Sequence, residues 1–156
     1  MSLERFHQAQ ASQSAGYETA LAEIRAGQKR SHWIWYIFPQ IEGLGRSSTA
    51  RAYALRDLNE ACDYLRDPVL SSRYEEIAGA VNEQLARGIS LENLMGSAVD
   101  ALKLVSSITL FRAAAENLAD KSPRAASLVE RCEAILTQAA AQGYPSCRQT
   151  LAHLAM

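Results

Sequence analysis

The sequence has 156 residues, of which 48% are hydrophobic and 21% are charged, and its net charge is −1. This length and composition are typical of one ordinary globular domain, so we expect a single domain over residues 1–156. The balanced charge excludes a global electrostatic attraction to nucleic acid or to an anionic membrane, and we expect neither as a partner.

Apolar residues recur at helical spacing along most of the chain. The first third of the sequence predicts three short helices. The first covers residues 3–10, the second carries a stripe of Tyr17, Leu21 and Ile24 and ends at Gly27, and the third begins near Ser31 and must stop near Pro39.

Serine or aspartate caps, twice followed by proline, mark the starts of the later helices. These helices are expected after Ser47 or Ser48, after Asp57, from Asp67-Pro68 to Gly88, from Ser90 to Gly96, from Asp100 to Asn117, from Ser122-Pro123 through Leu136, and after Pro145. No segment shows sustained period-2 alternation or an Asn-Gly hairpin turn. The sequence therefore predicts an all-α fold, a single irregular multi-helix bundle packed around a central aromatic helix.

Three cysteines, Cys62, Cys132 and Cys147, are widely spaced and form no Cys-x-x-Cys pair. Their odd number favours reduced thiols over a disulfide framework. The three histidines are also scattered, so we expect no metal site. The N-terminal residues are polar, and the longest apolar run, Trp33 to Pro39, is too short to span a bilayer. We therefore expect a cytoplasmic protein.

The segment from Lys29 to Gln40 holds both tryptophans of the chain, together with a histidine, a tyrosine and a phenylalanine. On a helical wheel one face carries Trp33, Ile34, Ile37 and Phe38 and is expected to be core. The other face carries His32, Trp35 and Tyr36. This polar-tipped aromatic face indicates either a surface that stacks on a flat ligand or a structural hydrogen-bond network.

Two further segments carry candidate site residues. In Gly43-Leu-Gly45-Arg46-Ser47, two glycines before a helix allow close backbone approach to an anion and Arg46 adds a bidentate donor, although a capped turn explains the same residues. The segment is not a Walker loop, and we expect no cofactor. In the later helix, Asp100, Lys103 and Ser107 share one stripe. A lysine-activated serine is conceivable there, but a solvated lysine and a serine bonded to its own helix are the simpler interpretation.

The motifs Lys29-Arg-Ser-His-Trp-Ile-Trp-Tyr-Ile-Phe-Pro-Gln40 and Gly43-Leu-Gly45-Arg-Ser resemble a bacterial family of unknown function whose members are often labelled calpastatin. The resemblance resumes at Asp100-x-Leu-Lys103-Leu and Ser106-Ser-Ile-Thr-Leu-Phe111 and covers about two thirds of the chain. It implies an all-α fold with helices around the aromatic segment and no established activity. The family pattern has a second acid where this chain has Ala101.

Two hypotheses of function follow. In the first, the protein binds or hydrolyses a small phosphorylated or nucleotide-like anion, with His32 or Asp100 as the acid–base group. The ligand would contact Lys29, Arg30, Trp35, Tyr36, Arg46, Lys103 and Ser107. In the second, the domain is a non-catalytic interaction or adaptor module, because tryptophan, tyrosine and arginine are the usual anchors of protein interfaces. The sequence leaves a homo-oligomer open under either hypothesis. Whether the protein is an enzyme stays open at this level.

Overall fold

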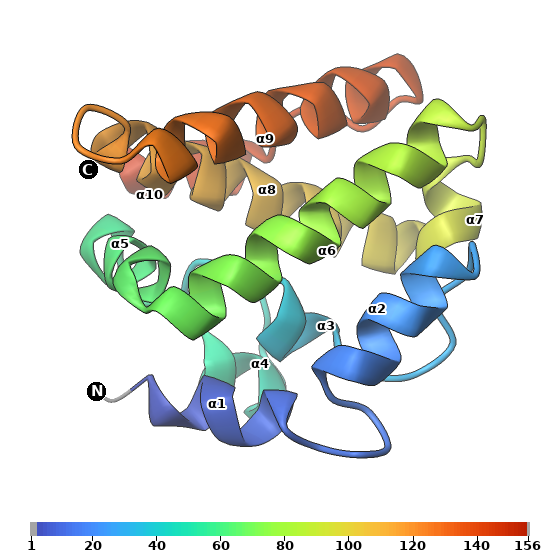
Figure 1. The fold of residues 1–156 in the computed structure, drawn as a ribbon, viewed down its shortest axis with the longest axis horizontal. Coiled ribbons are helices and arrows are strands. Elements are labelled where there is room, and N and C mark those ends of the chain that lie inside the picture. Colours follow the sequence, from blue (N-terminus) through green and yellow to red (C-terminus); the bar gives the residue numbers. More distant parts are fainter. Residues whose placement is uncertain (1–2, 156) are drawn as a thin grey trace.

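The helical periodicity produces ten helices over residues 3–155, the part of the chain that the computed structural model describes (Figure 1). The ends of the expected 1–156 domain, residues 1, 2 and 156, lie outside the described residues. The helices are α1 (Glu4–Gln10), α2 (Tyr17–Arg25), α3 (Ile34–Ile37), α4 (Ser48–Tyr53), α5 (Leu58–Arg66), α6 (Pro68–Ala86), α7 (Leu91–Met95), α8 (Ala98–Leu118), α9 (Pro123–Ala141) and α10 (Arg148–Leu154).

The caps predicted from the sequence begin the later helices. Asp67 accepts from the amides of Val69 and Leu70 at the start of α6, and Ser122 accepts from Ala125 at the start of α9. Helix α8 is expected from the sequence to begin at Asp100. It begins two residues earlier, at Ala98, because Ser97 is its N-cap. Capping supplies partners for amides that have none inside a helix, which is why these serine and aspartate residues mark the boundaries well.

Leu55 lies just beyond the end of the helix expected after Ser47 or Ser48. Helix α4 ends at Tyr53, and the chain then runs beside the segment after α3, where Ile41 and Leu55 form an isolated parallel bridge. The Leu55 amide donates to the Gln40 carbonyl at 2.9 Å and the Leu55 carbonyl accepts from the Glu42 amide at 2.8 Å. Two backbone hydrogen bonds thus join the residues after α3 to the residues after α4.

The all-α bundle is confirmed, but the helix at its centre is α8. This helix packs against α3, α5, α7, α9 and α10 and buries about half of its length. The expected aromatic helix is reduced to α3, a single turn of four residues. The aromatic segment still supplies core side chains, since Trp33 and Phe38 are both 0% exposed. A turn this short is held by its packing, because helix formation by itself needs a longer segment.

The core also contains a cluster of aromatic rings from four different helices. Phe6, Tyr64, Tyr74 and Phe111 are all buried, and the Tyr64 ring packs edge-on against the other three. Edge-to-face pairs of this kind stabilise a core beyond the area they bury. The cysteines are free thiols, with Cys62 and Cys132 buried as expected. Within residues 3–155, every helix is too short or too polar to cross a bilayer.

The two tryptophans differ in burial, which gives a test of the packing. Trp33 is fully buried and Trp35 is half-buried. We predict that Trp33→Ala lowers the free energy of unfolding by about 3–5 kcal/mol and that Trp35→Ala lowers it by less. Urea denaturation of the two variants checks this. Equal losses in the two variants would contradict the assignment of Trp33 to the core.

Candidate functional site

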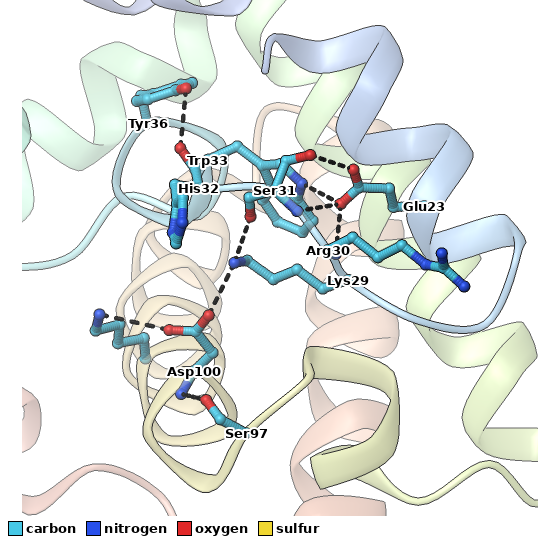
Figure 2. Close-up of polar contacts among 10 residues, drawn as sticks. Glu23, Lys29, Arg30, Ser31, His32, Trp33, Tyr36, Ser97 and Asp100 are labelled. Atoms are coloured by element: carbon cyan, nitrogen blue, oxygen red, sulfur yellow. Dashed lines mark hydrogen bonds and ion pairs between the residues drawn. The ribbon is translucent and has the colours of Figure 1, made fainter. Parts of the chain in front are cut away.

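One carboxylate holds the chain between α2 and α3 in place. Glu23, on α2, accepts from the amides of Arg30 and Ser31 at 2.7 and 2.9 Å, from the Ser31 hydroxyl at 2.5 Å and from the Trp33 indole at 2.9 Å (Figure 2). Burial raises the pKa of Glu23, but these hydrogen bonds, led by the Ser31 hydroxyl, outweigh it and lower the pKa to about 2. Residues 30–33 therefore have a fixed path without forming regular secondary structure.

The Lys29 ammonium is buried and fully partnered. Its side chain is 6% exposed, and Nζ lies 2.8 Å from Oδ2 of Asp100 on α8. The ammonium also donates to the Ser31 carbonyl at 2.6 Å and lies 5.0 Å from the centre of the Trp33 ring. A buried ammonium is costly unless it is paired and hydrogen-bonded, and here both conditions are met. Lys29 thus joins the aromatic segment to the first turn of α8.

The backbone around Lys29 is tied to the turn before α8 as well. The Lys29 amide donates to the Leu94 carbonyl at 2.7 Å. Gly96 ends α7 with a φ of +86°, and a Cβ at this position would lie 3.0 Å from the Lys29 carbonyl oxygen. Glycine adopts this conformation without strain and leaves room for the approach. The fit of Gly96 against Lys29 places the start of α8 beside the aromatic segment.

Asp100 and Lys103 are one turn apart at the N-terminal end of α8. The Asp100 amide donates to the Ser97 hydroxyl at 3.1 Å, which fixes the first turn. The Lys103 ammonium lies 3.4 Å from Oδ1 of Asp100 and 4.6 Å from the centre of the Trp35 ring. Asp100 is therefore held by a lysine on each carboxylate oxygen, while Lys103 covers the Trp35 ring through a cation–π contact.

These side chains surround a cavity of about 280 Å³, here called the lysine–aspartate cavity. It is lined by the charged residues Lys29, Asp100 and Lys103, by the polar residues His32, Ser47 and Thr49, and by Ile34 and Trp35. The residues come from the segment before α3, from α3, from the start of α4 and from the start of α8. With His32 neutral, the lining carries a net charge of +1.

Gly45 does not itself line the cavity, but it packs against Trp35, which does. A Cβ on Gly45 would lie 2.7 Å from the Trp35 indole and 2.5 Å from the Ala50 Cβ. Real Cβ atoms do not approach so closely, so a side chain here would displace the indole or α4. The absence of a side chain at Gly45 lets the loop before α4 pack directly on Trp35, and this packing supports one wall of the cavity.

Five of the nine residues predicted from the sequence line this cavity: Lys29, His32, Trp35, Asp100 and Lys103. Arg30 and Arg46 are exposed and lie outside the lining, although each directly neighbours a residue of the site. In Figure 2 the Arg30 guanidinium points away from Asp100. Arg46 immediately precedes Ser47 and forms no ion pair within residues 3–155.

Tyr36 and Ser107 do not face the cavity, and their placement corrects the expectation. The Tyr36 hydroxyl donates to the Ala15 carbonyl at 2.7 Å, and its ring lies on the far side of His32 from Asp100 (Figure 2). Ser107 is 0% exposed and shares a hydrogen bond of 3.0 Å with the Tyr74 hydroxyl. The Tyr36 hydroxyl therefore ties α3 to the segment before α2, and the Ser107 hydroxyl ties α8 to α6. Burial of Ser107 and its hydrogen bond to Tyr74 argue against a lysine-activated serine.

Sequence reasoning missed three residues that build the site. Glu23 lies on the second helix, which also carries Glu18, and no local pattern distinguishes the two acids. Ser47 and Thr49 line the cavity, but the sequence indicated a cap for the first and nothing for the second. Position 101, next to Asp100, is a fully buried alanine and therefore supplies no second carboxylate.

The fold and the site define an all-α domain in which a buried lysine and a central helix hold one carboxylate at a small cationic cavity. The chain belongs to the family described as "Protein of unknown function (DUF1810)", which matches residues 1–138. The family resemblance expected from the sequence is thereby confirmed.

A solved structure supports the same fold. The crystal structure of the conserved hypothetical protein Rv1873 from Mycobacterium tuberculosis is similar, with 37% sequence identity and a TM-score of 0.76. The similarity covers 99% of this chain and 96% of that chain. No curated protein matches the chain. These comparisons establish the family and the fold.

The low pKa of Glu23 predicts how stability depends on pH. A pKa of about 2, against an ordinary 4.5, means that the folded state favours the ionised carboxylate. We expect Glu23→Gln to lower the free energy of unfolding by about 2 kcal/mol at neutral pH. The difference between wild type and variant should be complete above pH 4.5 and should disappear as the pH falls towards 2.

Urea denaturation at several pH values measures this difference. Glu83→Gln is the matched control, because Glu83 is an exposed acid of α6 whose side chain makes no polar contact within the described residues. A Glu23→Gln loss that stays constant from pH 7 to pH 2 would show that the carboxylate charge is not what holds the segment.

Proposed function

We propose that the lysine–aspartate cavity binds a compact monophosphate ester, with the phosphate at Lys103 and the hydroxyl groups of the ligand at Asp100. The observation that carries this proposal is the meeting of Lys103, Asp100 and the Trp35 ring at one cavity with a net positive lining. A charged ammonium forms strong hydrogen bonds with phosphate oxygens, and a carboxylate accepts hydrogen bonds from hydroxyl groups.

The volume of the cavity limits the size of the ligand. At about 280 Å³ it lies just below the range for small-molecule sites, which is about 300–1,000 Å³. A sugar phosphate suits this volume better than a complete nucleotide. A nucleotide would place only part of its structure inside and leave the rest near the exposed Arg46.

The residues have different roles in this proposal. Lys29 is occupied by Asp100, the Ser31 carbonyl and the Trp33 ring, so it positions the carboxylate and is not free to receive the anion. Lys103 is 26% exposed and its pairing with Asp100 is looser, at 3.4 Å, so it is the cation available to a ligand. If the ligand is also hydrolysed, Asp100 and His32 are the acid–base candidates, because both line the cavity.

The alternative function, an interaction or adaptor module, has less support. The large hydrophobic side chains exposed among residues 3–155 are Val69, Val99, Leu102 and Leu151, which are spread over α6, α8 and α10. A stable protein interface buries about 800 Å² on each partner, which two neighbouring side chains such as Val99 and Leu102 cannot provide. A cytoplasmic location agrees with the free thiols of the three cysteines.

The two indole N–H groups give a direct test. Trp35 lines the cavity, whereas the Trp33 indole donates to Glu23 outside it. We predict that ribose 5-phosphate shifts the Trp35 indole signal in a proton–nitrogen NMR spectrum and shifts the Trp33 signal much less. Lys103→Ala should weaken this binding at least about tenfold, because a hydrogen bond to a charged group contributes about 1.5–3 kcal/mol.

Neutral ribose and the variant Arg148→Ala serve as controls. Ribose lacks the phosphate, and Arg148 is an exposed basic residue on α10 that does not line the cavity. Ribose should shift the Trp35 signal only weakly, and Arg148→Ala should bind like wild type. The proposal fails if ribose 5-phosphate leaves the Trp35 signal unchanged, or if Lys103→Ala and Arg148→Ala bind it equally well.

A further inference from the structure

A second and larger cavity lies at the opposite end of α8. It has a volume of about 510 Å³ and is lined by the end of α5, the start of α6, the end of α8 and the start of α9, which meet at the left of Figure 1. Its apolar lining consists of aliphatic side chains, among them Leu65, Leu118 and Leu128. We call it the aliphatic cavity. Its volume lies well inside the range for small-molecule sites.

The charged lining of the aliphatic cavity is entirely basic. Arg66, Lys121 and Arg124 belong to three different segments of the chain, and no acidic side chain among residues 3–155 lines the cavity. Arg66 pairs with Asp63 at 2.9 Å and Arg124 pairs with Glu75 at 3.0 Å. Both pairs are partly exposed to water, so they are weak and exchange partners readily.

Lys121 is the basic residue that stays available. It is exposed, lies in the turn between α8 and α9, and forms no ion pair within residues 3–155. Two 19-residue helices, α6 and α9, also begin at this cavity, at Pro68 and Pro123. Asp67 and Ser122 already cap their first amides, so an anion would be held by the basic side chains and favoured by the two helix dipoles.

Asp67 precedes Pro68 of the lining, but its carboxylate is bound elsewhere and does not neutralise the basic side chains of the cavity. One carboxylate oxygen of Asp67 accepts from the amides of Val69 and Leu70, and the other lies 2.7 Å from Nε2 of His7. Its charge is therefore engaged by α6 and by α1. With Arg66 and Arg124 in ion pairs, Lys121 remains as the available positive charge beside the aliphatic side chains of the lining.

From this complementarity we infer that the aliphatic cavity binds an aliphatic carboxylate of medium length, with the carboxylate at Lys121 and the chain on the leucine floor. Among the described residues, the lining contains no aromatic side chain on which a flat ring would stack, and this favours an alkyl body over an aromatic one. The basic rim favours an anionic head over a neutral one. This site is separate from the lysine–aspartate cavity and does not depend on the function proposed for it.

Decanoate, below its micelle concentration, is the probe. We expect it to shift the backbone NMR signals of residues around Leu118, Lys121 and Ala125. Decanol keeps the alkyl chain without the charge, and acetate keeps the charge without the chain. Each should bind at least about tenfold more weakly than decanoate, because each loses one of the two contributions.

Charge reversal at Lys121 tests the head group. Lys121→Glu should weaken decanoate binding at least about tenfold. Arg87→Glu, the same reversal at an exposed position at the far end of α6, should leave it unchanged. The melting temperature of each variant establishes that it is folded.

A filled cavity tests the alkyl part independently of charge. Ala125→Leu enlarges a side chain of the lining and should weaken decanoate binding while the rim stays basic. The inference is overturned if decanoate does not bind, if decanol binds as tightly as decanoate, or if Lys121→Glu and Arg87→Glu bind it equally.

Discussion

The site depends on the ion pair between Lys29 and Asp100. The ammonium is 6% exposed, and an unpaired ammonium in such a position costs several kcal/mol. The segment that carries Lys29 and the first turn of α8 that carries Asp100 must therefore form together. Because Lys29 holds one carboxylate oxygen, the other is left facing Lys103 and the cavity. The pair thus orders the segment before α3 and orients the Asp100 carboxylate at the same time.

Glu23 completes this arrangement from the other side. It accepts hydrogen bonds from Arg30, Ser31 and Trp33, while Lys29 reaches towards α8, so an irregular segment is held between two helices by side chains (Figure 2). An irregular backbone needs such partners, because it cannot satisfy its own polar groups as a helix does. The same contacts place His32 and Trp35 at the cavity. The contacts of Glu23 and Lys29 therefore both order the segment before α3 and set the positions of His32 and Trp35.

Features set by residues close together in the chain could be predicted from the sequence. Contacts between residues far apart in the chain could not. The caps of α6 and α9 and the Asp100–Lys103 pair one turn apart follow from local spacing. The Lys29–Asp100 and Glu23–Trp33 contacts do not, since only the fold brings these residues together. Tyr36 and Ser107 had the right chemistry for a site, but their hydroxyl groups bond to the Ala15 carbonyl and to Tyr74.

A double-mutant cycle on Lys29 and Asp100 tests the central claim most directly. The variants are Lys29→Met, Asp100→Asn and their combination, and the measurement is the free energy of unfolding in urea at neutral pH. If the buried pair couples the aromatic segment to α8, each single change is costly and the double change costs less than their sum by at least about 1 kcal/mol. Losses that add to within about 0.5 kcal/mol would contradict the account.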